Sequence, residues 1–132
     1  EADAQIIILG DFNDYPDNKS IARILNAQAE DGKADGELIN LAYELHSRGK
    51  GTYNYKGDWG MLDQAIVSDA LLVEKGLYAG LDALEIHQRD FMMYYDKRAG
   101  EKKPNRTYGG PKYYGGYSDH LPILLHLELA KD

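Results

Sequence analysis

Carboxylate, amide and imidazole side chains gather in three short segments of the sequence, each beside an apolar run. Asp11 and Asn13 belong to the first segment, Asp63 to the second, and Asp119 and His120 to the third. These side chains are the ligands that Mg²⁺, Mn²⁺ and Ca²⁺ prefer, and they also serve in acid–base catalysis. A structural zinc site would instead require cysteine, which the chain lacks, or several histidines. The segments therefore predict a site for a hard divalent cation with acid–base chemistry.

Each segment also has an ordinary structural explanation. Asp11 and Asn13 are typical turn residues after a strand. Asp63 lies on an apolar strand, where an ionised carboxylate needs a partner, and a structural salt bridge would satisfy it. Asp119 and His120 could simply hold the last strand in place. The catalytic interpretation therefore requires that the three segments meet in the fold.

A loop rich in glycine and tyrosine is expected at residues 97–117, directly before the third segment. A connection of about twenty residues is unusual in a compact domain and is often functional. Six tyrosines lie in or beside it: Tyr94, Tyr95, Tyr108, Tyr113, Tyr114 and Tyr117. Their rings could stack on a base or a sugar, or they could pack the loop onto the protein. We expect packing.

The apolar pattern predicts the elements that must position these segments. Strands are expected at residues 5–9, 51–55, 61–68, 83–87, 91–95 and 123–129, and helices at 18–26 and 38–48. One strand, two helices and then mainly strands favour an α+β layered fold over alternating βαβ units. The sequence shows no internal repeat and no linker, so we expect residues 1–132 to form a single domain.

The composition suits one globular core and excludes several kinds of protein. The chain has 132 residues, of which 43% are hydrophobic and 28% charged, and no cysteine for a disulfide. No apolar run reaches the ~20 residues of a membrane span, and no targeting segment fixes a compartment. The net charge of −7 argues against a protein that grips long nucleic acid through a basic surface. It does not exclude a nuclease, because a bound cation can carry the positive charge.

Taken together, the three segments resemble the signature of the endonuclease/exonuclease/phosphatase superfamily, the fold of deoxyribonuclease I. In that family Gly-Asp-Phe-Asn follows a buried strand, an Asp lies inside a later strand, and Ser-Asp-His-x-Pro precedes the last strand. The resemblance implies half of a four-layer αββα sandwich, with one mainly antiparallel sheet and helices on one face. It also implies a phosphoester hydrolase (phosphodiesterase, nuclease or phosphatase) that uses Mg²⁺ or Mn²⁺ and in-line attack of water on phosphorus.

The resemblance assigns a role to each residue of the three segments. Asp11 would orient or deprotonate the attacking water and, with Asp119, would bind the metal ion. Asn13 would hold a phosphate oxygen of the substrate. His120 would contact the scissile phosphate, with Asp63 as the carboxylate that fixes its ring.

Substrate contacts are less well defined by the resemblance. Arg106 and Tyr108 lie in a loop similar to that of uncharacterised bacterial members, and we expect both to bind the phosphoester substrate together with Asn13. Gln64 follows Asp63 where the family commonly has Tyr, His or Arg, so the contacts made at this strand stay open. The identity of the substrate is not fixed by the sequence.

The resemblance covers only the C-terminal half of such a domain, which runs to roughly twice this length. The N-terminal half supplies a metal-binding Glu, an Asn and a second His. We therefore expect a C-terminal fragment that is inactive alone. Its exposed sheet face would meet the missing N-terminal half or, in a homodimer, a second copy. The alternative is a non-catalytic binding module that uses the tyrosine-rich loop as its contact surface.

Overall fold

The largest sheet has four strands in the order β1-β6-β3-β2, and the computed structural model describes residues 3–29 and 37–131. These strands are β1 (Ile7–Asp11), β2 (Ala27–Gln28), β3 (Leu38–Asn40) and β6 (Asp63–Ser68). β6 pairs antiparallel with both β1 and β3, whereas β2 runs parallel to β3. β1 is therefore an edge strand. The uninterrupted apolar run in β6 explains its inner position, because Ala65, Ile66 and Val67 are fully buried.

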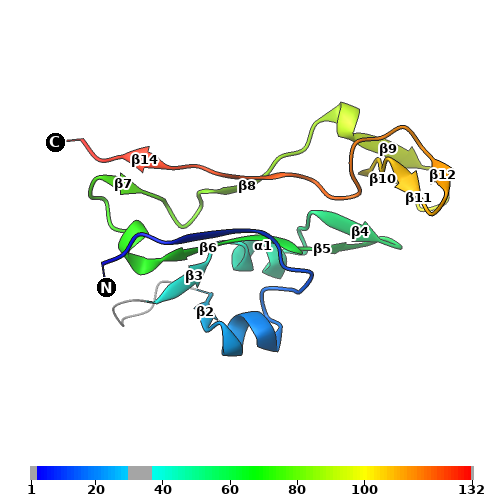
Figure 1. Cartoon of the computed structure of the whole chain (residues 1–132). Coiled ribbons are helices and arrows are strands. Elements are labelled where there is room, and N and C mark those ends of the chain that lie inside the picture. The colour runs from blue at the N-terminus through cyan, green and yellow to red at the C-terminus, as the bar shows by residue number, and fades with distance from the viewer. Residues whose placement is uncertain (1–2, 30–36, 132) are drawn as a thin grey trace.

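A second layer of short strands lies along one face of this sheet (Figure 1). It consists of β7 (Leu77–Tyr78), β8 (Leu84–Ile86), β13 (Ile123–Leu125) and β14 (Glu128–Leu129). β13 pairs with β8, and β14 pairs with β7, both antiparallel. The C-terminal strand expected at residues 123–129 is therefore divided between two partners.

The core consists of two clusters on opposite faces of β6. Ala65 and Val67 belong to the cluster that the second layer covers, which also contains Leu84. Ile66 faces the other way and packs with Ile21 of the π-helix η1 (Lys19–Ile24). Burial of each large aliphatic side chain contributes about 1.5–3 kcal/mol. Because side chains alternate between the two faces of β6, this strand packs against the second layer on one face and against η1 on the other.

Three β-hairpins lie at one end of the molecule, shown at the right of Figure 1. They are β4 (Tyr53–Tyr55) with β5 (Asp58–Gly60), β9 (Met93–Asp96) with β10 (Glu101–Pro104), and β11 (Tyr108–Gly109) with β12 (Lys112–Tyr113). The prediction of a loop at residues 97–117 is therefore wrong, since this segment contains three strands, β10, β11 and β12. Gly100 and Gly110 have φ of 72° and 59°, so these glycines form the tight turns between strands.

Helices are few and short. They are η1, α1 (Tyr43–Ser47), and the 3₁₀ turns η2 (Asp69–Leu71) and η3 (Asp90–Met92). The helix expected at 38–48 is wrong in its first half, because Leu38–Asn40 pairs with β6 and completely buries Ile39. No helix among the described residues combines the length and apolarity that a membrane crossing requires.

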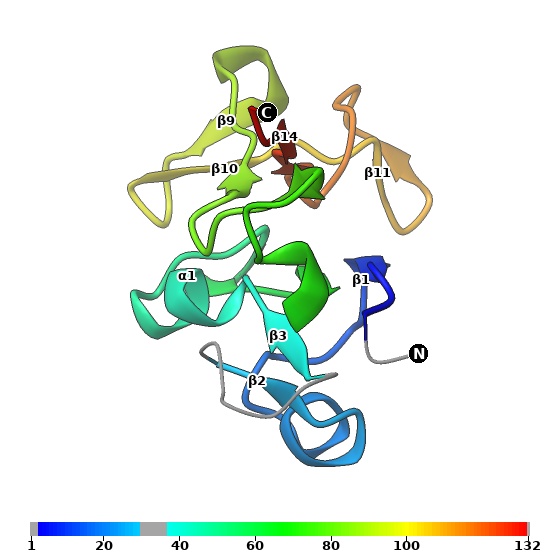
Figure 2. The same ribbon diagram turned by 90° about the vertical axis from the view of Figure 1, so that its left-hand side faces the viewer.

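The fold is strand-rich with few helices, which agrees with the expected α+β class. The expectation of one mainly antiparallel sheet is too simple, because the described strands form one four-stranded and five two-stranded sheets. The strands outside the largest sheet have two to four residues, too short to extend one continuous ladder. Figure 2 shows β2 and β3 at one end of this view and β9, β10 and β11 at the other.

Glu85 on β8 connects the second layer to two histidines. Its Oε2 lies 3.0 Å from His126 Nε2, and its Oε1 lies 3.4 Å from His87 Nδ1. The hydrogen bond with His126, followed by that with His87, lowers the pKa of Glu85 below its ordinary 4.5. The ionised carboxylate therefore stabilises the fold above about pH 4.5, and this contribution is lost as the pH falls through the depressed pKa.

We expect Glu85→Gln to lower the free energy of unfolding more at pH 7 than at a pH below the depressed pKa of Glu85, because the carboxylate is then protonated and its contribution is lost. Urea unfolding at the two pH values measures this difference. Glu74→Gln, at an exposed position, is the control and should show no such pH dependence. An equal loss at both pH values would contradict the electrostatic role of Glu85.

Candidate active site

β1 and β6 place two carboxylates side by side. Asp11 and Asp63 face each other as the last pair of the β1–β6 ladder. Directly opposed residues of an antiparallel pair project from the same face of the sheet. Phe12 N donates to Leu62 O at 2.9 Å, which continues the pairing past this position. The register of the sheet therefore sets the spacing of the carboxylates.

Asp63 also binds an imidazole and a hydroxyl through one oxygen. His120 Nδ1 lies 2.7 Å from Asp63 Oδ2, and Thr52 Oγ1 donates to the same oxygen at 2.5 Å. Thr52 is fully buried, and its carbonyl oxygen accepts from Leu121 N at 2.8 Å, which fixes the segment next to His120. The ring of His120 packs on Tyr53, with centroids 4.9 Å apart. Because Asp63 occupies Nδ1, Nε2 is the atom left to face a substrate.

The loop after β1 is held by its own polar side chains. Asn13 N donates to Asp11 Oδ1 at 2.8 Å, and Asn13 has φ of 52°, a left-handed conformation that asparagine tolerates. The carboxylate of Asp14 accepts from Ser20 Oγ at 2.6 Å and from Asn18 Nδ2 at 2.7 Å. These bonds, first that of Ser20, lower the pKa of Asp14. The ionised Asp14 thereby connects this loop to η1.

Gln64 supports the same loop from inside the protein. This fully buried side chain donates from Nε2 to Asp14 O at 2.6 Å and accepts at Oε1 from Asn40 Nδ2 at 2.7 Å. Asn40 Oδ1 in turn accepts from Ala42 N at 3.0 Å. Gln64 lies on the face of β6 opposite to that of Asp63. It positions the loop rather than contacting a substrate.

Sequence reasoning gave no role to Thr52 and left the contacts of Gln64 open. A lone threonine after Gly51 gives no signal of its own. An amide in the middle of an apolar strand is a usable signal, because a buried amide requires hydrogen-bond partners. That rule predicts that Gln64 is bonded, but not to which groups.

The site can be compared with the needs of a divalent cation. Asp11, Asp63 and His120 each offer a ligand atom within 4.8 Å of the others. His120 Nδ1 occupies Oδ2 of Asp63, and Asn13 N occupies Oδ1 of Asp11. Each carboxylate therefore keeps one oxygen for a metal ion. Two carboxylate oxygens fit a hard cation such as Mg²⁺ or Mn²⁺. The donor set therefore suits the expected ion better than it suits zinc.

The remaining predicted residues lie around this centre. Asp119 is not in the three-residue group, and its Oδ2 lies 3.7 Å from Arg106 Nη2. Both side chains are more than 40% exposed. Tyr108 lies on β11, packs against Tyr113 with centroids 5.2 Å apart and is 60% exposed. The structure thus brings Arg106 to the loop of His120 and places Tyr108 on the adjoining hairpin.

The expected packing of the tyrosines is wrong. Tyr94 is 43% exposed and Tyr117 is 70% exposed, and the other four lie between these values. The short hairpins explain the difference, since a two-stranded sheet buries little of its side-chain surface.

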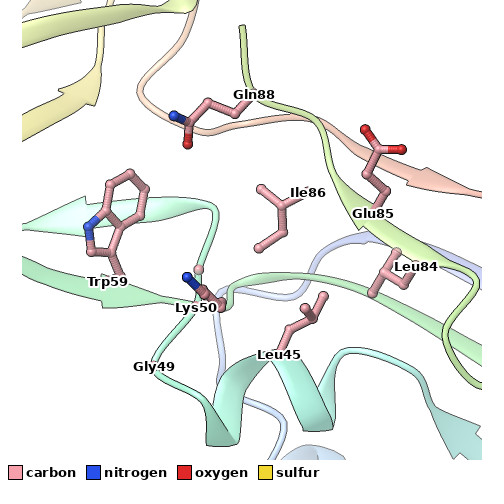
Figure 3. A pocket seen from close by; sticks show the side chains of 9 residues that line it. Leu45, Gly49, Lys50, Trp59, Leu84, Glu85, Ile86 and Gln88 are labelled. Carbon is pink, nitrogen blue, oxygen red and sulfur yellow. The ribbon is translucent and has the colours of Figure 1, made fainter.

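A cavity of about 590 Å³ lies apart from these residues, between α1 and β8 (Figure 3). Its lining includes Leu45, Trp59, Ile86, Lys50 and Gln88. None of the predicted site residues lines this cavity. The candidate active site instead lies at the end of the β1–β6 ladder.

Comparison with known proteins agrees with the geometry. A family model described as Endonuclease/Exonuclease/phosphatase family matches residues 1–129 of the 132-residue chain, which include all three polar segments. A search of curated proteins and a search of solved structures found no match. Because the family model covers nearly the whole sequence, the chain belongs to the endonuclease/exonuclease/phosphatase family.

Proposed function

We propose that this chain is the C-terminal part of a metal-dependent phosphoester hydrolase that uses in-line attack of water on phosphorus. The supporting observation is that Asp11, Asp63 and His120 lie far apart in sequence, yet their possible ligand atoms lie within 4.8 Å of one another. Membership of a family of hydrolases acting on phosphoesters supports the reaction class. The non-catalytic alternative, a binding module, leaves this convergence unexplained.

Each side chain of the site has its own role in the proposed reaction. Asp11 Oδ1 accepts from Asn13 N, so Oδ2 is available to orient and deprotonate the attacking water. The exposed amide of Asn13 donates to a non-bridging phosphate oxygen. His120 presents Nε2 to the phosphoryl group while Asp63 and Thr52 hold the ring. Asp11 and Asp63 would each offer one oxygen to Mg²⁺ or Mn²⁺, with Asp119 at the rim, and the bound ion would supply positive charge against the phosphate oxygens.

Another part of the same domain covers the open face of β1 in this proposal. Ile7 and Leu9 are 41% and 53% exposed, although they share a sheet face with the buried Val67 and Ala65. Such an apolar face beside a catalytic carboxylate favours a partner surface. The largest sheet, with η1 packed on its other face, then supplies one sheet layer and one helix layer of a four-layer αββα sandwich. The covering segment supplies a further acidic ligand and a second histidine, so the chain alone lacks turnover.

Hydrolysis of bis(p-nitrophenyl) phosphate tests the proposal. With Mn²⁺, we expect no turnover by the 132-residue chain alone and clear turnover by the complete domain, meaning the chain joined to the N-terminal half that this proposal requires. EDTA should remove the activity. Asp11→Ala should lower it at least about 10³-fold, because the attacking water loses its base and the metal a ligand.

Asp82→Ala, at an exposed aspartate outside the site, is the matched control and should leave turnover unchanged. Undiminished turnover by Asp11→Ala would rule out the proposed site. Turnover by the chain alone would show that no covering segment is needed. Light scattering distinguishes a monomer from a homodimer in which a second copy covers β1.

A further inference from the structure

Residues 89–117 form a surface whose charge is opposite to that of the rest of the chain. This segment, here called the hairpin surface, comprises η3, β9, β10, β11 and β12. It contains seven Lys and Arg and three Asp and Glu, a net charge of +4, whereas all other residues together carry −11. The overall charge of −7 therefore conceals a basic region.

The acidic residues of the hairpin surface are paired within it. Asp90 binds Lys102 at 2.7 Å, and Lys103 lies 3.2 Å from Asp96 and 3.5 Å from Glu101. Four exposed cations take part in none of the salt bridges found among the described residues: Arg89, Lys97, Arg98 and Lys112. The positive charge of this surface is therefore available to an external anion.

Aromatic rings are concentrated on the same surface. It holds seven of the 14 aromatic residues of the chain. Phe91 is 60% exposed, as is Tyr108, and all six tyrosines have more than two fifths of their area in solvent. Lys112 Nζ lies 4.8 Å from the ring centroid of Tyr114, so charge and ring are adjacent. This number of exposed rings exceeds the scattered apolar residues of an ordinary surface.

Close backbone contacts hold the ring of Tyr114 and bring two segments of this surface together. A Cβ on Gly109 would lie only 2.7 Å from the ring of Tyr114, so the ring packs directly on the backbone. A Cβ on Gly116 would collide with the carbonyl of Asn105, which shows how closely the two segments approach. A ring that is already held, as that of Tyr114 is, loses little conformational entropy when a ligand binds.

The hairpin surface adjoins the candidate active site. Thr107 Oγ1 donates to Tyr117 O at 2.9 Å, directly before the loop of His120, and Arg106 Nη2 lies 3.7 Å from Asp119 Oδ2. On the other side, Asn54 Nδ2 of β4 lies 3.5 Å from Glu101 Oε1 of β10. Figure 1 shows β9, β10, β11 and β12 at the same end of the molecule as β4 and β5.

We propose that the hairpin surface binds single-stranded nucleic acid and leads its backbone to Asp11 and His120. Exposed rings stack on unpaired bases of any sequence, and exposed cations bind the phosphates between them. A duplex hides the faces of its bases, and a small phosphoester would leave most of the rings without a contact. The acidic remainder of the chain repels a polyanion and so confines it to this surface. The inference names the substrate class of the proposed hydrolase and rests on that function.

Fluorescence anisotropy with a labelled oligothymidylate of about 20 nucleotides, long enough for one to five single-strand sites, tests the binding. The assay uses the full 132-residue chain, and circular dichroism checks that each variant is folded. EDTA is added to prevent hydrolysis of the oligonucleotide. We expect Tyr108→Ala/Tyr113→Ala to weaken binding at least about tenfold. Lys97→Glu/Arg98→Glu should weaken binding and flatten its salt dependence by about 0.7 in log–log slope for each phosphate that the variant no longer binds.

Lys19→Glu/Arg23→Glu is the matched control, because it reverses two charges on η1, away from the hairpin surface (Figure 1). It should change affinity less than about twofold, the small effect expected where no phosphate is bound. If this control weakens binding as much as Lys97→Glu/Arg98→Glu does, the assigned surface is wrong.

An abasic strand of equal length separates stacking from charge, since it keeps the phosphates and lacks the bases. Weaker binding of the abasic strand and of a duplex supports the proposal, whereas equal or tighter binding of either overturns it. If the complete domain hydrolyses bis(p-nitrophenyl) phosphate but the chain does not bind the oligonucleotide, only this inference fails. If the oligonucleotide binds and no phosphodiester is hydrolysed, the proposed function fails instead.

Discussion

Replacing Asp63 with asparagine is expected to lower phosphoester turnover by the complete domain about 10²–10⁴-fold, the range that a positioned acid–base group contributes. One carboxylate oxygen of Asp63 receives both His120 Nδ1 at 2.7 Å and Thr52 Oγ1 at 2.5 Å. An amide keeps the size of the side chain but removes its charge and half of its accepting capacity. The ring of His120 then loses the group that orients it, while the buried strand is left intact.

Thr52 provides graded variants for the same test. Thr52→Val removes the hydroxyl from Asp63 and should have a smaller effect than Asp63→Asn, whereas Thr52→Ser keeps the hydroxyl and should restore turnover. Nitrogen NMR of His120 in the chain gives a readout independent of activity, because Asp63→Asn changes the hydrogen-bond partner of Nδ1. Unchanged turnover together with an unchanged His120 spectrum would contradict this positioning role.

Gln64→Leu should lower the free energy of unfolding by about 2–5 kcal/mol, a large share of the stability of a small domain. Leucine fills a similar volume but leaves Asp14 O and Asn40 Nδ2 without their bonds of 2.6 and 2.7 Å. Each unsatisfied buried group costs about 1–3 kcal/mol. Urea denaturation measures the loss.

The control is Gln88→Leu, at an exposed glutamine that lines the separate cavity. It should change stability by less than about 0.5 kcal/mol, as surface substitutions usually do. Asn40→Leu/Gln64→Leu should be less destabilising than the sum of the two single changes, because they share one hydrogen bond. Additive losses would show that the amides act independently. Gln64→Leu should also reduce turnover, since the loop of Asp11 and Asn13 loses its inner support.

The convergence of Asp11, Asp63 and His120 was predictable because each follows or precedes a strongly apolar run. A strand end is a restricted place in a fold, so residue type and position together limit where the side chain can lie. The contacts of Thr52 and Gln64 were not predictable, because each bonds to a residue at least 11 positions away. Such bonds depend on the register of strands, which the sequence alone does not specify.

The errors in the fold have the same origin. Leu38 and Ile39 fit a helical period as well as a strand, and pairing with Ser68 and Val67 decides between them. In residues 97–117 the glycines indicate turns, but strands of two to four residues are too short to show a period. The basic charge of this region was averaged away in the sum over the whole chain.

The register of β1 has one more consequence. Ser68 N donates to Ile6 O and Phe12 N donates to Leu62 O, so the even-numbered positions of this strand bond inward. By alternation, the backbone groups of Ile7, Leu9 and Asp11 point away from the sheet, where a further strand can add. A strand added there would run alongside Asp11 itself. Assembly would then activate hydrolysis, because the polypeptide that pairs with the edge of β1 would also lie beside the reaction centre.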